Sequence, residues 1–150
     1  MGAPGYLVAS SLRGIVAQRL VRRNCDNCAQ PYTPNQEEAF WLSNIDAASE
    51  NVTFKKGEGC QKCNQTGYRG RIGVFELLEM TDAMMNALKV GDTVAFADAA
   101  TKSKHYRPLS YAALTYAKMG ITSVEEVLRL VEMVAEAPEE ESVTDGEDNG

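Results

Sequence analysis

The chain has 150 residues, of which 44% are hydrophobic and 24% are charged, and its formal net charge is −6 at pH 7. It contains no run of about 18 apolar residues, which argues against a membrane-spanning helix, and its first residues lack the basic start of a signal peptide. We therefore expect a cytoplasmic protein with no direct membrane insertion, in a compartment where cysteines stay reduced.

The negative charge is concentrated at the C-terminal end of the chain. Residues 136–150 hold seven acidic residues and no lysine or arginine, so the rest of the chain carries a net charge of +1. A segment with high charge and no aromatic side chain cannot bury enough apolar surface to offset the entropy that ordering costs. We predict that residues 136–150 form a disordered acidic tail, which serves solubility or, as the alternative, docking.

The first predicted element is a helix over residues 9–23. Its apolar residues recur at the spacing of one helix face, and they are Leu12, Ile15, Val16, Leu20 and Val21. The arginines beside them are expected to form its solvated face. We assign residues 1–24 to this terminal helix.

All four cysteines lie in two Cys-x-x-Cys pairs, Cys25 with Cys28 and Cys60 with Cys63. Each pair can direct two thiolates from one tight turn toward the same cation, and two pairs complete a tetrahedral shell. We predict one structural zinc ion per chain, bound by all four cysteines. A disulfide pairing and a redox-active Cys-x-x-Cys are the alternatives.

The spacer between the pairs has 31 residues, more than the about 15–20 that are usual for this motif, so it must contain folded structure. Residues 33–36 (TPNQ) match a capping box that starts at Thr33. A short helix should follow, and residues 52–54 should form a short strand. We expect Phe40 and Trp41 to form a miniature core within this insertion.

The second half of the chain is predicted to be one strand followed by helices. The strand covers residues 72–80, and the helices cover 82–90, 93–101, a segment from Arg107 to a stop at Gly120, and 124–135. The predicted fold class is α+β and mostly helical. A zinc-stabilised lobe with short strands, residues 25–72, packs on a C-terminal strand and helical bundle, residues 73–135.

Four thiolates on one Zn²⁺ leave a net charge near −2, which nearby cations and N–H donors must compensate. The candidates are Lys62, Tyr68, Arg69 and Arg71. They either support the metal site or form a contact surface for a partner or a nucleic acid. A closed four-sulfur shell leaves no open position for catalysis, and the chain has no phosphate-binding loop. We predict no catalytic residue in this chain.

Three segments resemble the motor ATPases of type II secretion and type IV pilus assembly, the GspE/PilB type. They are residues 12–25 (LRGIVAQRLVRRNC), 57–78 (GEGCQKCNQTGYRGRIGVFELL) and 120–129 (GITSVEEVLR). Residues 6–12 and 107–109 look most like the MSHA-pilus MshE subgroup.

The resemblance implies that this chain is the portion after the ATP-binding motifs, with residues 1–24 as the terminal helix of the ATPase core. The family's tetracysteine zinc module maps onto the four cysteines. The full-length protein would then bind ATP and Mg²⁺ and form a homo-hexamer. Its partner would be the cytoplasmic domain of an inner-membrane pilus or secretion platform component, which makes the protein peripheral to the inner membrane. Gln18 and Arg19 are candidates for the nucleotide site.

A free-standing zinc-ribbon module that binds nucleic acid or protein is the alternative function. Its sequence cue would be a gathering of arginines on one face, and these arginines are Arg13, Arg19, Arg22, Arg23, Arg69 and Arg71. The nearly neutral charge of the chain without its acidic end argues against nucleic acid as the partner.

Overall fold

The computed structural model describes residues 4–46, 49 and 52–135, so the predicted tail over 136–150 lies outside the described residues. The described part contains six α-helices and four β-strands, and the strands form two antiparallel two-stranded sheets. The prediction of an α+β, mostly helical fold is confirmed.

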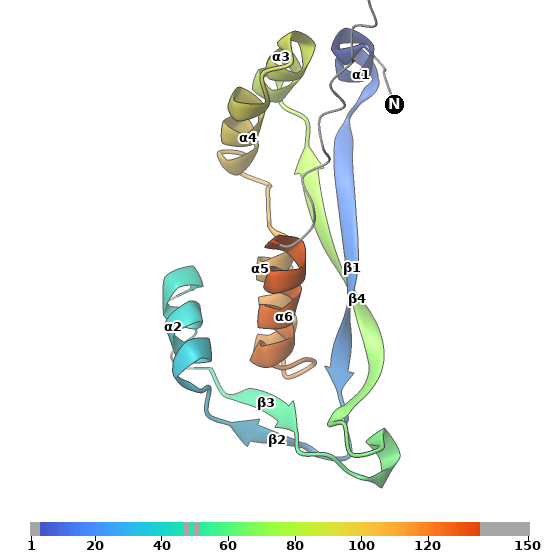
Figure 1. The fold of residues 1–150 in the computed structure, drawn as a ribbon, viewed down its shortest axis with the longest axis vertical. Helices are drawn as coiled ribbons and strands as arrows, with labels where there is room; N and C mark the ends of the chain where they lie inside the picture. The colour runs from blue at the N-terminus through green and yellow to red at the C-terminus, as the bar shows by residue number, and fades with distance from the viewer. Residues whose placement is uncertain (1–3, 47–48, 50–51, 136–150) are drawn as a thin grey trace, which may run out of the picture.

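A long two-stranded ribbon runs along the molecule and connects its two ends (Figure 1). It pairs β1 (Gly14–Asn24) with β4 (Tyr68–Glu79). The register is regular from Gly14 opposite Glu79 to Arg22 opposite Arg71, and then shifts so that Asn24 lies opposite Tyr68. Gly70 sits at this shift with φ of +81°, as expected for a bulge that bends a strand. The bend occurs where the ribbon reaches the cysteines.

The predicted helix over residues 9–23 is wrong. Only α1 (Gly5–Ser11) is helical there, and the arginine-rich part is strand β1. One face of β1 packs on the core through Val21, which is 1% exposed, while Val16 and Leu20 on the other face are 65% and 54% exposed. Because both faces carry apolar side chains, the two-residue alternation of a strand was hidden.

The spacer between the cysteine pairs folds as β2 (Ala29–Tyr32), α2 (Gln36–Ile45) and β3 (Phe54–Gly57). Its helix is capped by Asn35 rather than by Thr33, which corrects the predicted capping box. The Asn35 side chain accepts from the Glu38 N–H at 2.9 Å, and the Glu38 carboxylate accepts from the Asn35 N–H at 2.8 Å. Both positions match the sequence pattern, since Gln36 follows Thr33 and Glu38 follows Asn35 by three residues, and the reciprocal bonds form at Asn35.

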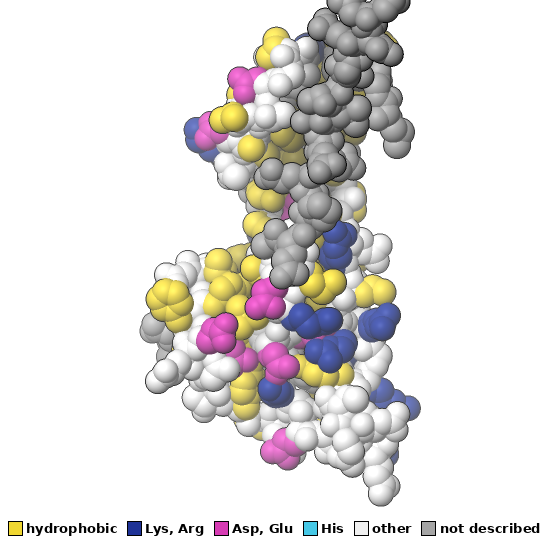
Figure 2. Space-filling view, viewed as in Figure 1, with side chains coloured by type: hydrophobic (Ala, Val, Ile, Leu, Met, Phe, Trp, Pro, Cys, Tyr) yellow, Lys and Arg dark blue, Asp and Glu magenta, His cyan; other side chains and the backbone are white. Residues whose placement is uncertain are grey.

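The four helices of the second half were predicted to within about two residues, the uncertainty usual for helix ends. They are α3 (Asp82–Val90), α4 (Thr93–Thr101), α5 (Leu109–Lys118) and α6 (Val124–Ala135). They lie in two groups (Figure 1): α3 and α4 join α1 at one end, and α5 and α6 pack against the other half of the ribbon. The space-filling view shows the same division, with a narrower waist between the two groups (Figure 2).

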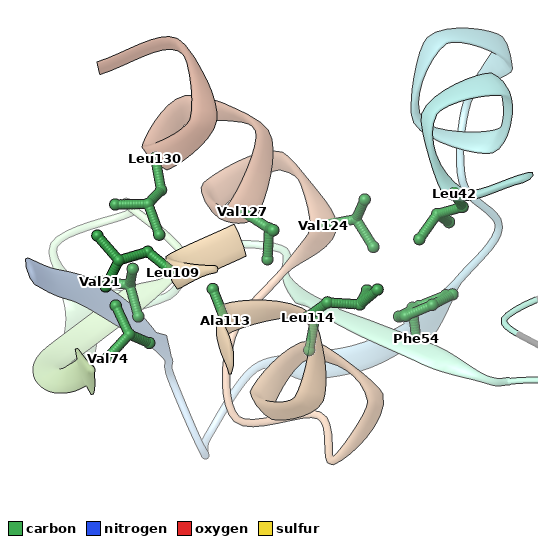
Figure 3. Close-up of a cluster of buried hydrophobic side chains, with 11 residues drawn as sticks. Val21, Leu42, Phe54, Val74, Leu109, Ala113, Leu114, Val124, Val127 and Leu130 are labelled. Carbon is green, nitrogen blue, oxygen red and sulfur yellow. The ribbon is translucent and has the colours of Figure 1, made fainter. Parts of the chain in front are cut away.

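The main hydrophobic core joins the ribbon, α5 and α6 to the spacer (Figure 3). Leu42 of α2 and Phe54 of β3 are buried in it together with residues of the ribbon and of both helices. The predicted miniature core is therefore wrong. Trp41 is partly buried and packs against the main core, while Phe40 is 73% exposed.

This difference between two adjacent aromatic residues can be measured. We expect Trp41→Ala to lower the free energy of unfolding by about 2 kcal/mol, because it removes a partly buried aromatic side chain from the core. Phe40→Ala should change it by less than about 0.5 kcal/mol, as an exposed position does. Urea denaturation of the two variants tests this, and equal losses would contradict the assignment of Trp41 to the main core.

Candidate metal centre

Each cysteine pair lies on its own tight turn at the end of the molecule opposite α1 (Figure 1). In the first turn, between β1 and β2, the carbonyl of Cys25 accepts N–H bonds from Cys28 at 3.1 Å and from Ala29 at 2.9 Å. In the second, the carbonyl of Cys60 accepts from Cys63 at 3.2 Å and from Gln65 at 2.9 Å. The two turns share the bond from the N–H of the second cysteine to the carbonyl of the first, which brings the two cysteines of each pair together.

Glycines allow the two turns to come together. A Cβ atom on Gly57 would lie 2.0 Å from the carbonyl oxygen of Gly67, so no other residue fits at this crossing. Gly67 has φ of +77°, a conformation that side-chain-bearing residues rarely adopt. Its carbonyl accepts a bond from the Cys25 N–H at 2.9 Å, which links the segment after the second cysteine pair to the first pair.

The four sulfur atoms form a compact cluster. The Sγ–Sγ distances are 3.9 Å for Cys25 and Cys60, 3.8 Å for Cys28 and Cys63, and 3.7 Å for Cys60 and Cys63. All four sulfurs lie within 4.8 Å of one another, and all four cysteines are free thiols. A tetrahedron with metal–sulfur bonds of about 2.3 Å has edges of about 3.8 Å. The cluster therefore fits one tetrahedrally coordinated metal ion.

Backbone N–H groups are directed at the sulfurs of the second pair. Cys63 Sγ accepts from the N–H groups of Cys60 at 3.1 Å and Gly67 at 3.3 Å. Burial opposes ionisation of Cys63, but these donors outweigh it and lower its pKa to about 6. Burial raises the pKa of the Cys28 thiol to about 12, so a bound cation must supply the charge that keeps this ligand deprotonated.

The four residues predicted beside the metal take different positions. Burial opposes ionisation of Cys60, but the backbone N–H groups of Cys63 and Lys62 help to lower the pKa of this thiol, so Lys62 supports the sulfur through its main chain. The side chains of Lys62, Arg69 and Arg71 are exposed. Tyr68 instead points toward the helices, where its hydroxyl lies 2.6 Å from Ser123 Oγ. A role of the three exposed cations in partner contact stays a prediction.

We call the part of the chain between β1 and β4, which contains both cysteine pairs, the metal lobe. Sequence reasoning missed the segment that connects this lobe to the helices. This segment, residues 120–126, joins α5 to α6, and we call it the α5–α6 junction. The Asn24 backbone N–H donates to the Ile121 carbonyl at 2.8 Å, and the Thr122 hydroxyl donates to the Arg22 carbonyl at 2.7 Å. The Asn24 side chain donates to the carbonyls of Gly120 at 3.0 Å and Lys55 at 2.9 Å. The residue directly before Cys25 is thereby fixed to the helices.

The other three strands reach the same junction. From β2, the Tyr32 hydroxyl accepts the Val124 N–H at 3.2 Å. From β3, Lys56 forms an ion pair with Glu125, and from β4, the Tyr68 hydroxyl bonds Ser123 as described above. Every described strand therefore contacts the α5–α6 junction, which seats the metal lobe on the body.

Glu126 is the charged centre of this junction and is only 1% exposed. Its carboxylate accepts from the Arg22 backbone N–H at 2.9 Å and from the Arg22 Nε at 2.8 Å, and it is 2.6 Å from Arg129 Nη2. The Arg22 guanidinium also lies 4.2 Å from the centre of the Tyr68 ring, in cation–π geometry. No local sequence signal pairs Glu126 with a residue so far away along the chain.

The predicted nucleotide-site candidates, Gln18 and Arg19, are exposed on β1, where the Arg19 guanidinium donates to the Gln18 carbonyl at 2.9 Å. Their role at a nucleotide stays a prediction. Strand alternation places Arg19 and Arg23 on one face of β1 and Arg22 on the other. Arg22 also lies directly opposite Arg71 of β4 in the register of the ribbon. A nucleic-acid-binding role of these arginines stays a prediction.

Comparison with known proteins places this chain in a family of secretion system proteins. A model of the family described as Type II/IV secretion system protein matches residues 1–129. The chain belongs to this family, as its sequence motifs predicted. No helix of the described residues is long and apolar enough to cross a membrane.

Two relatives illustrate the similarity. The chain is 36% identical over 134 residues to Type II secretion system ATPase E of Vibrio cholerae, an alignment that covers 87% of this chain and 25% of that protein. It is 34% identical over 128 residues to Type IV pilus assembly ATPase PilB of Thermus thermophilus, which covers 85% and 14% respectively. The chain thus spans a quarter or less of these relatives, and the MshE subgroup stays a prediction.

Proposed function

We propose that this chain is the zinc-stabilised C-terminal module of a motor ATPase that powers pilus assembly or type II secretion, and that it transmits ATP-driven motion to an inner-membrane partner. The observation that carries the proposal is the α5–α6 junction. A lobe that transmits motion must be fixed to the body that moves, and hydrogen bonds or ion pairs from all four strands meet at this one segment.

Zinc is the metal that best suits the site. Four thiolates in a closed tetrahedron favour a soft cation without an open coordination position, which is the arrangement of structural zinc. Such an ion would stabilise the lobe and perform no chemistry itself. ATP and Mg²⁺ would be bound by the rest of a full-length protein, which we propose to be a cytoplasmic homo-hexamer at the inner membrane.

The exposed cations of the lobe are the proposed partner contact. Lys62, Arg69 and Arg71 are exposed beside the metal site, and within the described part of the chain no salt bridge engages them. Exposed cations of this kind attract an acidic surface and set the rate and register of docking. We therefore propose that the cytoplasmic domain of the platform component presents acidic groups to this end of the molecule.

The test is a charge reversal in the full-length motor. We expect Arg69→Glu to weaken binding of the platform's cytoplasmic domain by about tenfold, or about 1.4 kcal/mol. ATP hydrolysis and zinc content should stay unchanged, because Arg69 is an exposed residue at a strand bulge.

Arg13→Glu is the matched control, since Arg13 is also exposed but precedes the other end of β1. It should leave platform binding at the wild-type level. Unchanged binding by Arg69→Glu, or equal loss by both variants, would contradict the proposed contact.

A further inference from the structure

A groove runs from the last turns of α6 across the loop between α4 and α5 to the outer side of α5. It consists of three adjoining hollows. The first and second share Tyr106 and Pro108, and the second and third share Arg107 and Tyr111. We call it the α5 groove, and its main lining residues are Phe75, Tyr106, Arg107, Pro108, Tyr111 and Thr115. Phe75 and Tyr111 are 54% and 39% exposed, so the groove presents aromatic surface to solvent.

The groove has a cationic edge. Lys104 and Arg107 are both exposed, and the Arg107 guanidinium lies 5.7 Å from the centre of the Tyr111 ring. Neither cation has an acidic partner among the residues that the structure describes, whereas nearby Lys102 pairs with Asp98 at 2.7 Å.

An acid does line the groove, but its carboxylate is already engaged. The Glu76 carboxylate accepts the Leu109 N–H at 3.1 Å, and burial together with the nearby Glu76 raises the pKa of Tyr106. The groove therefore combines aromatic walls with two uncompensated positive charges. This combination suits an acidic peptide, because carboxylates pair with the cations while short apolar side chains cover the rings.

The chain itself carries such a peptide directly beside the groove. Val134, in the last turn of α6, lines the first hollow, and residue 136 follows one position after the end of that helix. Residues 136–150 contain seven acidic residues together with Ala137, Pro138 and Val143. Fifteen residues can span at most about 50 Å, whereas α5 with its ten residues is only about 15 Å long. The segment can therefore reach every part of the groove.

We propose that residues 136–150 dock in the α5 groove of the same chain, with their carboxylates paired to Lys104 and Arg107. Each exposed ion pair contributes little by itself. Because the segment is tethered at the mouth of the groove, however, its effective concentration reaches the millimolar range and weak contacts suffice. The docked segment would cover Phe75 and Tyr111 and would compete with any other acidic ligand of this surface. The proposal does not depend on the function proposed above.

The test compares the zinc-loaded chain of 150 residues with a version that ends after Ala135. We expect amide hydrogen exchange over residues 104–116 to be faster in the shortened chain by about threefold or more, because docking protects this segment. Adding a synthetic peptide of residues 136–150 should restore the protection. Its affinity should fall when salt is raised from 50 to 500 mM, as expected for exposed charge pairs.

Charge reversals at the groove locate the binding site of the peptide. Arg107→Glu and Lys104→Glu in the shortened chain should each weaken peptide binding by about tenfold. Arg13→Glu makes the same charge change at an exposed position before β1 and should leave the affinity unchanged. Zinc content and circular dichroism confirm that each variant is folded.

Three results would overturn the proposal. Exchange over residues 104–116 that is the same with and without residues 136–150 would show that the groove is not covered. Equal weakening by Arg13→Glu and Arg107→Glu would show that the attraction depends on overall charge rather than on the groove. Protection that increases with protein concentration would assign the segment to a neighbouring copy rather than to its own chain.

Discussion

Cys63→Ser is expected to abolish metal binding and unfold the lobe between β1 and β4. Cys63 is buried, is one of the four clustered thiols, and accepts two backbone N–H bonds at its sulfur. Structural zinc contributes an apparent binding free energy of about 10–16 kcal/mol, which is comparable to the about 5–15 kcal/mol by which a whole domain is stable. A three-thiolate site cannot retain most of this free energy.

The damage should spread beyond the lobe, because the spacer contributes Leu42 and Phe54 to the main core. We expect zinc content to fall from one equivalent per chain to near zero and the midpoint of thermal unfolding to drop by more than about 10 °C. Elemental analysis and a thermal melt measure both effects.

The control is Gln61→Ser in the same turn, since Gln61 is exposed and offers no ligand. It should bind one zinc ion and melt at the wild-type temperature. A Cys63→Ser chain that still bound one equivalent and melted normally would refute a structural role of the metal. If elemental analysis found no zinc in the wild-type chain, that result would instead support the disulfide or redox alternative.

Glu126→Gln is expected to have the second largest effect, lowering the free energy of unfolding by about 2–3 kcal/mol. The substitution keeps the shape of the side chain but removes the charge that Arg22 and Arg129 contact. Hydrogen bonds to charged groups contribute about 1.5–3 kcal/mol each. The loss stays below that of a fully buried ion pair, because the side chains of Arg22 and Arg129 are 38% and 47% exposed and can be hydrated.

Glu125→Gln is the matched control, one residue earlier on the same helix. Its ion pair with Lys56 is exposed on both sides, at 48% and 42%. Exposed pairs contribute about 0.2–1 kcal/mol, so this variant should be destabilised much less. Urea denaturation compares the two. Equal losses would show that Glu126 has no special role in holding the lobe.

The difference between wild type and Glu126→Gln should depend on pH. Burial favours the neutral acid, but Arg129 and Arg22 outweigh burial and lower the pKa of Glu126. A carboxyl group whose pKa is lower in the folded state stabilises the protein fully above its unfolded pKa of about 4.3. That stabilisation is lost as the pH falls through the folded pKa. The stability difference should therefore be constant from pH 6 to 8 and shrink below about pH 4.

Local signals in the sequence predicted the parts of the fold that depend on neighbouring residues. Thr81 accepts the Met84 N–H at the start of α3, and Gly91 ends that helix with φ of +73°. The cysteine pairs likewise predicted their own cluster, because their spacing already satisfies the geometry of a metal ion.

The remaining features depend on residues that are far apart in the sequence. Residues 14–24 form a strand because they pair with β4. Tertiary contacts of this kind override the helical spacing of the apolar residues in this segment. Glu126 meets Arg22 across 104 positions, and Tyr68 meets Ser123 across 55. The spacing of residues along the sequence does not reveal partners this far apart. The α5–α6 junction was therefore not predicted.

The long spacer between the cysteine pairs also affects the entropic cost of forming the metal centre. A shared ion would link Cys25 to Cys60, which are 35 positions apart, and so close a loop that contains α2 and both strands of the small sheet. The cost of closing a loop rises slowly with its length, by only about 0.6 kcal/mol for each doubling. The free energy of a metal–thiolate site far exceeds this increment. Insertions at the exposed turns of the spacer should therefore be tolerated, while the glycine crossing of Gly57 and Gly67 allows no change at all.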